Sequence, residues 1–230
     1  WFHLSDGSSS YIKQLFKHER FRKKDIKVLK NHRVDYVEPI KNKREGLKVS
    51  LQIENLEKKE KYTIEVDELI FACHANQTLL CLNDSRPEYS LLKSIRFQKN
   101  VGYLHNDKRL MPKRKSVWSA WNYLAREKCC YDENISVTYW MNKLQNLKIN
   151  QNIFVSLNPF LEPNESMYKK KLVYDHPVFD QDMIDAREKL LKIQGLDHIW
   201  HSGAWTGNGF HEDGFVSGKK VAAAINDKTN

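Results

Sequence analysis

Glycine is concentrated near the C-terminus, where Gly203 to Gly218 reads "GAWTGNGFHEDGFVSG" and holds five of the chain's nine glycines. Glycine costs conformational entropy on folding, so a cluster indicates a loop that needs positive φ angles or a backbone that another molecule approaches closely. The preceding "HIWHSG" predicts a short strand, and "KKVAAAI" predicts a helix. The spacing alone supports a tight structural loop and a ligand site about equally.

A strand, a glycine loop and a helix in this order favour ligands with anionic or polar atoms, because backbone N–H groups and the helix dipole converge there. The final helix is predicted over about 212–226, with Gly214, Ser217 or Gly218, and Val221 on one face that a flat molecule or a strand can approach. Gly207 and Gly209 form a G-x-G, but no third glycine follows at the step that the dinucleotide-binding fingerprint requires.

The composition is that of a globular protein, since 40% hydrophobic and 11% aromatic residues over 230 positions suffice for a core in one large or two modest domains. The 38 basic and 29 acidic residues give a formal charge of +9. Lys13 to Arg33 holds nine basic and two acidic side chains. We interpret this run as a solvated helix face rather than a nucleic-acid or membrane patch, because basic residues are also spread along the rest of the chain.

The cysteines predict a reducing, cytoplasmic environment, because Cys73, Cys81 and the adjacent Cys129 and Cys130 form no C-x-x-C pair and suit neither a zinc site nor a disulfide framework. We expect no metal, since three histidines lack ligand spacing and are interpreted as ordinary polar groups: His74, His105 and His176. The apolar runs "LIFAC" and "VAAAI" are far shorter than the ~20 residues of a membrane-spanning helix. The chain begins at Trp1 without signal-peptide features, and we expect it to be part of a longer one.

The periodicity along the chain predicts an α+β fold with two entangled regions. A helix over about 9–20 is followed by five strand patterns, "IKVLK", "RVDYVEPI", "LKVSLQIE", "YTIEV" and "DELIFAC". The continuous apolar run of the last predicts a buried central strand. Two short helices follow, "ANQTLLCL" and "EYSLLKSI", and then a β-rich region: "FQKNVGYLHND", "SVWSAWNYL", "ISVTYWMNKL", "NIFVSLNP" and "KKKLVYDH". An amphipathic helix over 179–195, closed by Gly195, precedes the strand and the final helix described above.

"FVSGKKVA" after a glycine loop resembles the C-terminal flavin-contacting segment of the flavin-containing amine-oxidase and phytoene-desaturase superfamily. The longer "HSGAWTGNGFHEDGFVSG" is similar to one bacterial branch of it, the amine-oxidase-like FAD/NAD-binding flavoproteins. Further segments resemble signatures of this branch in the same order: "GSSSYI", "FACHANQTL", "LHNDKRLMPKRKSVWSAWNYL", "VTYWMNKLQ", "SLNP" and "HPVFD".

The resemblance implies an FAD-dependent oxidoreductase of which this chain is the C-terminal portion. The family's N-terminal strand, G-x-G-x-x-G loop and helix, which hold the ADP half of FAD in a Rossmann-like unit, have no counterpart in this sequence. The expected partner is therefore the missing N-terminal half of the same protein. Residues 1–95 would be part of an α/β FAD-binding domain with a β-meander, 96–178 an antiparallel β-rich substrate region, and 179–230 a helix-strand-helix segment that returns to the flavin.

The cofactor-binding residues that the resemblance implies lie in the glycine loop and the start of the final helix: Gly203, Ala204, Trp205, Thr206, Gly207, Gly209, Phe210, His211, Glu212, Asp213 and Gly214. Two positions depart from the family. Ala204 stands where the wider superfamily usually has an acid that holds the ribityl or phosphate region, and Asp6–Gly7 replaces the branch's glycine pair before the first helix. The first departure puts the cofactor contact at position 204 in doubt, and the second implies an altered close approach at the turn before the first helix.

Flavin chemistry needs few protein side chains, because the isoalloxazine itself accepts the hydride; no catalytic residue is identified. The implied substrate is a small amine or an unsaturated, lipid-like molecule, and the latter is compatible with peripheral membrane contact. Five aromatic residues are candidates for an apolar substrate pocket: Trp118, Trp121, Tyr123, Tyr139 and Trp140. Strand alternation favours core positions for some, so only those on a cavity face can be functional.

The alternative hypothesis is a non-enzymatic basic module that binds RNA or an anionic membrane surface. Basic and aromatic residues lie in different segments, which favours the flavoenzyme and predicts no nucleic-acid partner. As a separate segment, the 230 residues are expected to be inactive and to bind FAD without useful affinity.

Overall fold

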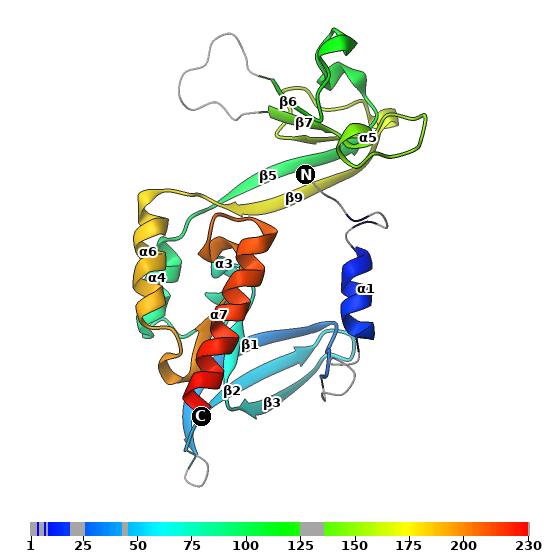
Figure 1. Ribbon diagram of the computed structural model, residues 1–230. Helices are drawn as coiled ribbons and strands as arrows, with labels where there is room; N and C mark the ends of the chain where they lie inside the picture. Colours follow the sequence, from blue (N-terminus) through cyan, green and yellow to red (C-terminus); the bar gives the residue numbers. More distant parts are fainter. Residues whose placement is uncertain are drawn as a thin grey trace. The chain divides into compact units, whose positions relative to one another are not determined.

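The computed structural model describes residues 4, 7, 9–18, 26–42, 46–124 and 136–229 (Figure 1). The chain divides into two compact units: unit 1 comprises Trp1–Lys27 and Lys99–His176, and unit 2 comprises Val28–Gln98 and Pro177–Asn230. Helices and mainly antiparallel strands occur together, so the predicted α+β class is confirmed. The structure groups residues 1–27 with 99–176, whereas the sequence predicted that residues 1–27 belong with 28–95. The functions assigned to the three predicted segments remain predictions.

Unit 2 begins with an antiparallel meander of three strands in the order β1-β2-β3: β1 (His32–Asn42), β2 (Gly46–Asn55) and β3 (Glu60–Val66). Alternation along β2 buries Val49, Leu51 and Ile53 on one face. The strand predicted over "IKVLK" is wrong. Residues 26–29 have no regular structure, and Ile26, Val28 and Leu29 are exposed, because an alternating pattern becomes a strand only where a neighbour pairs with it.

The apolar run "LIFAC" forms a strand of only three residues, β4 (Leu69–Phe71), parallel to β10 (Ile199–His201). The prediction of a buried central strand is therefore wrong for the described part of the chain. There β4 pairs with β10 alone, and Ile70 is 43% exposed although Phe71 is buried. A continuous apolar run indicates a strand that is buried on both faces. Such burial requires packed layers on both sides of the sheet, and the described residues do not cover both sides of β4.

Four α-helices of unit 2 lie near these sheets: α3 (Ala75–Thr78), α4 (Pro87–Ser94), α6 (Gln181–Lys192) and α7 (His211–Thr229). All four were predicted, although α3 is shorter than "ANQTLLCL" and α7 extends beyond 226. Helix α6 was predictable because the sequence marks both of its ends. At its start the Asp180 side chain accepts the Met183 N–H at 2.9 Å, and after its end Gly195 adopts φ +75°. Its buried Met183, Ala186 and Leu190 pack on the core of unit 2.

The turn between α6 and β10 is held by a buried arginine. Arg86 donates from Nε to Glu88 Oε1 at 2.5 Å and from Nη1 to Asp197 Oδ2 at 3.1 Å. Asp197 and the next residue, His198, have φ angles of +51° and +64°, a left-handed conformation that is costly outside glycine. The ion pair therefore fixes the strained turn from which β10 starts.

Unit 1 is built on a five-stranded sheet with the order β6-β7-β8-β5-β9. The strands are β5 (Phe97–His105), β6 (Trp121–Leu124), β7 (Ser136–Trp140), β8 (Phe154–Leu157) and β9 (Tyr168–Pro177); β5 and β9 extend across the boundary with unit 2. Short helical segments connect them: η1 (Lys108–Leu110), η2 (Lys115–Val117), α5 (Met141–Leu144) and η3 (Glu165–Met167). Helix α1 (Ser9–Lys17) covers most of the predicted 9–20. Cys129 and Cys130 lie outside the described residues.

Candidate functional site

The glycine loop runs from the end of β10 through η5 (Ala204–Thr206) to the start of α7. Gly203 has φ +148° and Gly209 has φ +86°, so the predicted need for positive φ is confirmed at both. Gly207 has φ −119°, which other residues also adopt, but a side chain does not fit at this position. A Cβ atom on residue 207 would lie 2.6 Å from Oδ1 and 2.7 Å from Cβ of Asp213. The loop is therefore packed tightly against the first turn of α7.

Hydrogen bonds within the loop satisfy much of its backbone. The Ala204 carbonyl accepts the N–H groups of Gly207 at 3.1 Å and Gly209 at 3.0 Å. The Gly203 carbonyl accepts the Thr206 hydroxyl at 2.7 Å, and the Gly203 N–H donates to Ser217 Oγ at 2.9 Å. These bonds fix the loop in one conformation, as binding of a rigid ligand requires.

Trp205 joins the loop to the end of β4. Its side chain is buried, and its Nε1 donates to the Cys73 carbonyl at 3.0 Å. From the other side, Arg187 of α6 donates from Nη1 to the Gly207 carbonyl. The loop is therefore held by a strand end and by a helix of unit 2.

The N-terminus of α7 carries two carboxylates, Glu212 and Asp213. Asp213 Oδ2 accepts the Phe210 N–H at 2.9 Å, and both acids oppose the positive end of the helix dipole, which is equivalent to about half a charge. Two negative charges outweigh that dipole, so this end disfavours a phosphate. It suits a neutral ligand with polar edge atoms better.

The small-residue face of α7 lies against the strand end and the loop. A Cβ on Gly214 would be 3.5 Å from the Ala204 nitrogen, and one on Gly218 would be 3.7 Å from Ser202 Oγ, while Val221 is buried. Of the two partners that the sequence left open, a flat molecule or a strand, this face contacts the chain itself. Phe210 and Phe215 are instead exposed.

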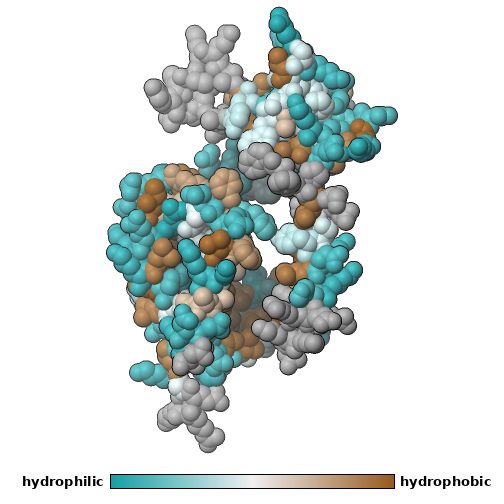
Figure 2. Space-filling view, viewed as in Figure 1, coloured by the Kyte–Doolittle hydropathy of each residue, from teal (hydrophilic) through white to brown (hydrophobic). Residues whose placement is uncertain are grey.

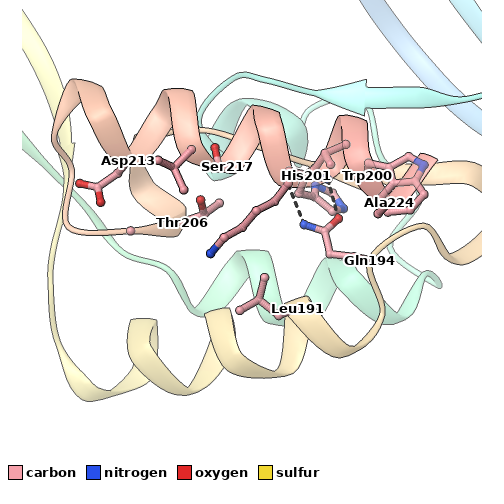
Figure 3. A pocket seen from close by; sticks show the side chains of 12 residues that line it. Leu191, Gln194, Trp200, His201, Thr206, Asp213, Ser217 and Ala224 are labelled. Carbon is pink, nitrogen blue, oxygen red and sulfur yellow. Dashed lines mark hydrogen bonds between the residues drawn. The ribbon is translucent and has the colours of Figure 1, made fainter. Parts of the chain in front are cut away.

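A cavity of about 270 Å³ lies between α6, β10, the loop and α7 (Figure 3). Thr206, Gly207 and Asp213 are the predicted cofactor residues that line it; the rest of that set does not. Ser217 and Val221, which the sequence placed on the small-residue face of the final helix, also line it. Sequence reasoning missed the other lining residues: Leu191, Gln194, Trp200, His201, Val216, Lys220 and Ala224. The spacing of positions 213, 217, 220 and 224 on one helical face was the available signal, but the wall contributed by α6 depends on tertiary packing.

Gln194 and His201 form the end of this cavity. The Gln194 side chain donates from Nε2 to the His201 carbonyl at 2.7 Å and accepts the His201 N–H at 2.9 Å (dashed in Figure 3). The His201 side chain is 3% exposed and stacks on Phe71 at 5.6 Å between ring centroids. Burial, aided by the positive charge of Arg86, lowers the pKa of His201 to about 4, so the ring is neutral at pH 7.

The five aromatic pocket candidates lie in unit 1 and divide between the two faces of its sheet. Trp118 is not in a strand, contrary to the strand predicted over "SVWSAWNYL"; it follows η2 and is 8% exposed. With Phe154 and Trp140 it forms an apolar cluster of edge-to-face rings. Trp121 and Tyr139 make an edge-to-face pair from adjacent strands at 5.4 Å, and Tyr123 is 64% exposed. Strand alternation therefore leaves Trp121, Tyr123 and Tyr139 on the open face.

The sequence predicted that His74, His105 and His176 are ordinary polar groups, and the structure shows a polar partner for His105 and for His176 in unit 1. His105 Nδ1 accepts the Asp107 N–H at 3.1 Å, so Nε2 carries the proton and donates to Ser156 Oγ at 2.8 Å. Burial lowers the pKa of His105 to about 4. His176 Nδ1 lies 2.9 Å from the Asn100 amide nitrogen. His74 precedes α3, beside the ring of Phe97 in unit 2.

Among the described residues, no three His, Cys, Asp or Glu side chains gather as a metal site would require. None of the helices in that part of the chain combines the length and apolar character needed to cross a bilayer.

No protein-family model matches the chain, and no curated protein matches it. A CLA-producing fatty acid isomerase from P. acnes is similar in structure, with 12% identity, TM-score 0.49, and 86% of this chain and 47% of the isomerase covered. The flavin-dependent monooxygenase PieE, solved with FAD and substrate, has 11% identity and TM-score 0.39 over 75% of this chain and 29% of its own. RebC-10x, solved native and with bound K252c, has 11% identity and TM-score 0.36 over 74% and 31%. The chain thus spans less than half the length of each, and such distant likenesses carry no argument about activity.

Proposed function

We propose that this chain is the C-terminal part of an FAD-dependent oxidoreductase of the amine-oxidase-like family. One observation supports this most: the segment that resembles the family's flavin-contacting motif folds as a strand, a fixed glycine loop and a 19-residue helix. Gly203 and Gly209 adopt φ angles that other residues rarely adopt. The proposed cofactor contacts are the loop and first-turn residues named in the sequence analysis.

The residues of this segment fit one part of FAD and not another. The isoalloxazine has a neutral edge of carbonyl and N–H groups, which matches the first-turn amides of α7 and the acids beside them. The pyrophosphate does not fit here, because Glu212 and Asp213 repel it and Arg187 is bonded to the Gly207 carbonyl. The proposed N-terminal half would therefore bind the pyrophosphate, as glycine loops at helix N-termini do.

When bound, the flavin supplies the hydride acceptor for oxidation of an amine or of an unsaturated, lipid-like substrate. The chain's own part is to orient and to exclude water. Ser217 and Thr206 hold the Gly203 turn, Arg187 holds Gly207, and Trp205 fixes the loop to β4. In unit 1, the open face with Trp121, Tyr123 and Tyr139 offers an apolar surface for such a substrate.

The test is to purify the protein with its upstream half and record its absorbance spectrum. Flavin bands that survive desalting are expected, and a colourless, folded protein that takes up no added FAD would refute the proposal. Gly209→Val should lower flavin occupancy, because the side chain strains φ +86° and its Cβ would lie 3.1 Å from Phe179. Gly46→Val is the matched control: it strains a similar φ of +84° at the first residue of β2, where the added Cβ meets no described atom within 4 Å.

The 230-residue chain by itself should bind FAD poorly, because the acids at the start of α7 disfavour the pyrophosphate beside the proposed flavin loop. Isothermal titration with FAD measures this. Monomeric chain that binds FAD with a micromolar or lower Kd would show that the cofactor site is complete without an N-terminal half, and would remove that part of the proposal.

A further inference from the structure

A strongly basic segment lies in unit 1, whereas the proposed flavin loop belongs to unit 2. It follows β5 and reads "KRLMPKRK" from Lys108 to Lys115, with five basic residues in eight and no acid. Lys108 is exposed, and so is every residue from Lys113 to Val117. The segment forms the green turns at the upper edge of Figure 1, and Figure 2 shows mainly hydrophilic residues there, with single apolar ones among them.

One of the five charges is neutralised. Asp107 is almost fully buried and accepts from Arg109 Nε at 3.0 Å and Nη2 at 2.6 Å, which holds the pKa of Asp107 well below its usual range. Asn164 Oδ1 also accepts from Arg109 Nη2, at 2.7 Å. Within the described ranges, no carboxylate forms an ion pair with the other four basic side chains, Lys108, Lys113, Arg114 and Lys115. The segment therefore presents four uncompensated positive charges.

Three of these four basic residues lie beside a cavity of about 460 Å³ with an apolar floor. Lys108, Lys113 and Lys115 contribute to its lining, while Met111 and Trp118 are buried below. Trp118 Nε1 donates to the Pro112 carbonyl at 2.7 Å, which ties the segment down at its middle. The cavity is thus a fixed hollow that suits a compact anionic group and not a metal ion or a second cation.

The exposed apolar group of this segment is aliphatic. Val117 is 58% exposed and directly follows the Lys113–Ser116 stretch. Single-stranded RNA binding uses aromatic faces on which bases stack, and the aromatic residue within this segment, Trp118, is turned inward against Trp140 and Phe154. Basic side chains interleaved with an exposed aliphatic residue are instead typical of contact with a bilayer surface, where lysines meet phosphates and the aliphatic group enters the interface.

We propose that Lys108–Trp118 binds the surface of an anionic bilayer, with one lipid phosphate in the cavity. The proposal does not depend on flavin binding and would hold for a non-enzymatic protein. It specifies where on the chain membrane contact occurs and which headgroup chemistry it recognises.

The test measures co-sedimentation of the 230-residue chain with phosphatidylserine-containing vesicles and with pure phosphatidylcholine vesicles at low and physiological salt. The chain is expected to bind the phosphatidylserine-containing vesicles and not the pure phosphatidylcholine vesicles, and salt is expected to weaken this binding. Each basic residue near such a surface contributes roughly fivefold to partitioning. The triple variant Lys113→Gln/Arg114→Gln/Lys115→Gln should therefore bind about a hundredfold more weakly.

The matched control removes three exposed charges elsewhere in unit 1: Lys148→Gln/Lys169→Gln/Lys170→Gln. It should stay within about threefold of the parent, because these positions lie outside the basic segment. Equal losses in the two triple variants would show attraction by net charge alone and would overturn the site. Circular dichroism of each variant separates lost binding from lost folding.

Two further arms separate the sources of phosphate. Val117→Gln, which removes the aliphatic group without adding a charge, should weaken vesicle binding while leaving the affinity for inorganic phosphate unchanged within twofold. If this variant binds vesicles as well as the parent does, entry of Val117 into the bilayer is refuted. If the parent binds inorganic phosphate but no anionic vesicle, the cavity binds free phosphate and not a bilayer. A single-stranded RNA bound more tightly than the vesicles, or a parent chain that binds no anionic vesicle, would overturn the proposal.

Discussion

Gly207→Ala tests whether the loop and the first turn of α7 are packed as closely as the structure indicates. The new Cβ would lie 2.6 Å from Asp213 Oδ1 and 2.7 Å from Asp213 Cβ. The carboxylate can rotate away, but Cβ is fixed to the helix backbone, so α7 or the loop must shift. Overpacking of this kind costs about 1–3 kcal/mol.

The shift also endangers the bond from the Phe210 N–H to Asp213, since a hydrogen bond to a charged group contributes about 1.5–3 kcal/mol. A loss of about 3 kcal/mol in the free energy of unfolding is therefore expected for Gly207→Ala. Urea unfolding followed by circular dichroism measures it through the shift in midpoint at constant slope.

Gly214→Ala is the control, because its Cβ would meet the Ala204 nitrogen at an ordinary 3.5 Å and alanine favours the helix by about 1 kcal/mol. It should be neutral or stabilising. In an Asp213→Gly background, Gly207→Ala should cost less than 1 kcal/mol, because the opposing Cβ is gone. If Gly207→Ala is as stable as the parent, or costs the same in both backgrounds, the packing argument is wrong.

Three other outcomes follow from the buried groups. Arg86→Met should lower the free energy of unfolding by about 3–5 kcal/mol, because it leaves the buried Glu88 carboxylate unpaired; a loss under 1 kcal/mol in a urea titration would contradict this. The free energy of unfolding should fall as the pH drops from about 6.5 to 4, because the pKa of His201 is about 4 in the folded chain and the unfolded chain binds more protons in this range. His201→Asn should flatten this dependence between pH 7 and 5. An unchanged slope in the variant would contradict the role given to His201. Trp118→Ala should cost about 3–5 kcal/mol of stability, whereas Trp121→Ala should cost little. With the proposed N-terminal half present, Trp121→Ala should change turnover more than flavin content. Similar melting curves for the two variants would show that the two faces were assigned wrongly.

Local signals in the sequence were enough for some elements. Helix α6 carries its own start at Asp180, its own periodicity and its own end at Gly195, so its position was predictable without knowledge of its neighbours. Strand β4 was not, because an apolar run does not say which partners cover it, and Ile70 is exposed. Burial of a strand residue is a property of the layers around it.

In the candidate site, too, some features were predictable from local sequence and others depend on tertiary packing. Positive φ at Gly203 and Gly209 followed from glycine clustering, which reflects a local backbone requirement. Gln194 and Lys220 could not be found in this way, because they meet only where α6 and α7 pack beside β10. Among the aromatic candidates, alternation predicted that two faces exist, but it could not say which of Trp118 and Trp121 would be covered.

The two hydrogen bonds between Gln194 and His201 determine at which edge a further strand can join the parallel sheet. A strand that joined at β10 would have to displace a side-chain amide already bonded to both the N–H and the carbonyl of His201. Addition at β4 displaces no such bond in the described part of the chain, so assembly with a further strand is expected from that side only. Gln194→Ala should make the sheet extendable from both sides and raise the proportion of dimers in sedimentation velocity; an unchanged proportion would show that Gln194 does not block this edge.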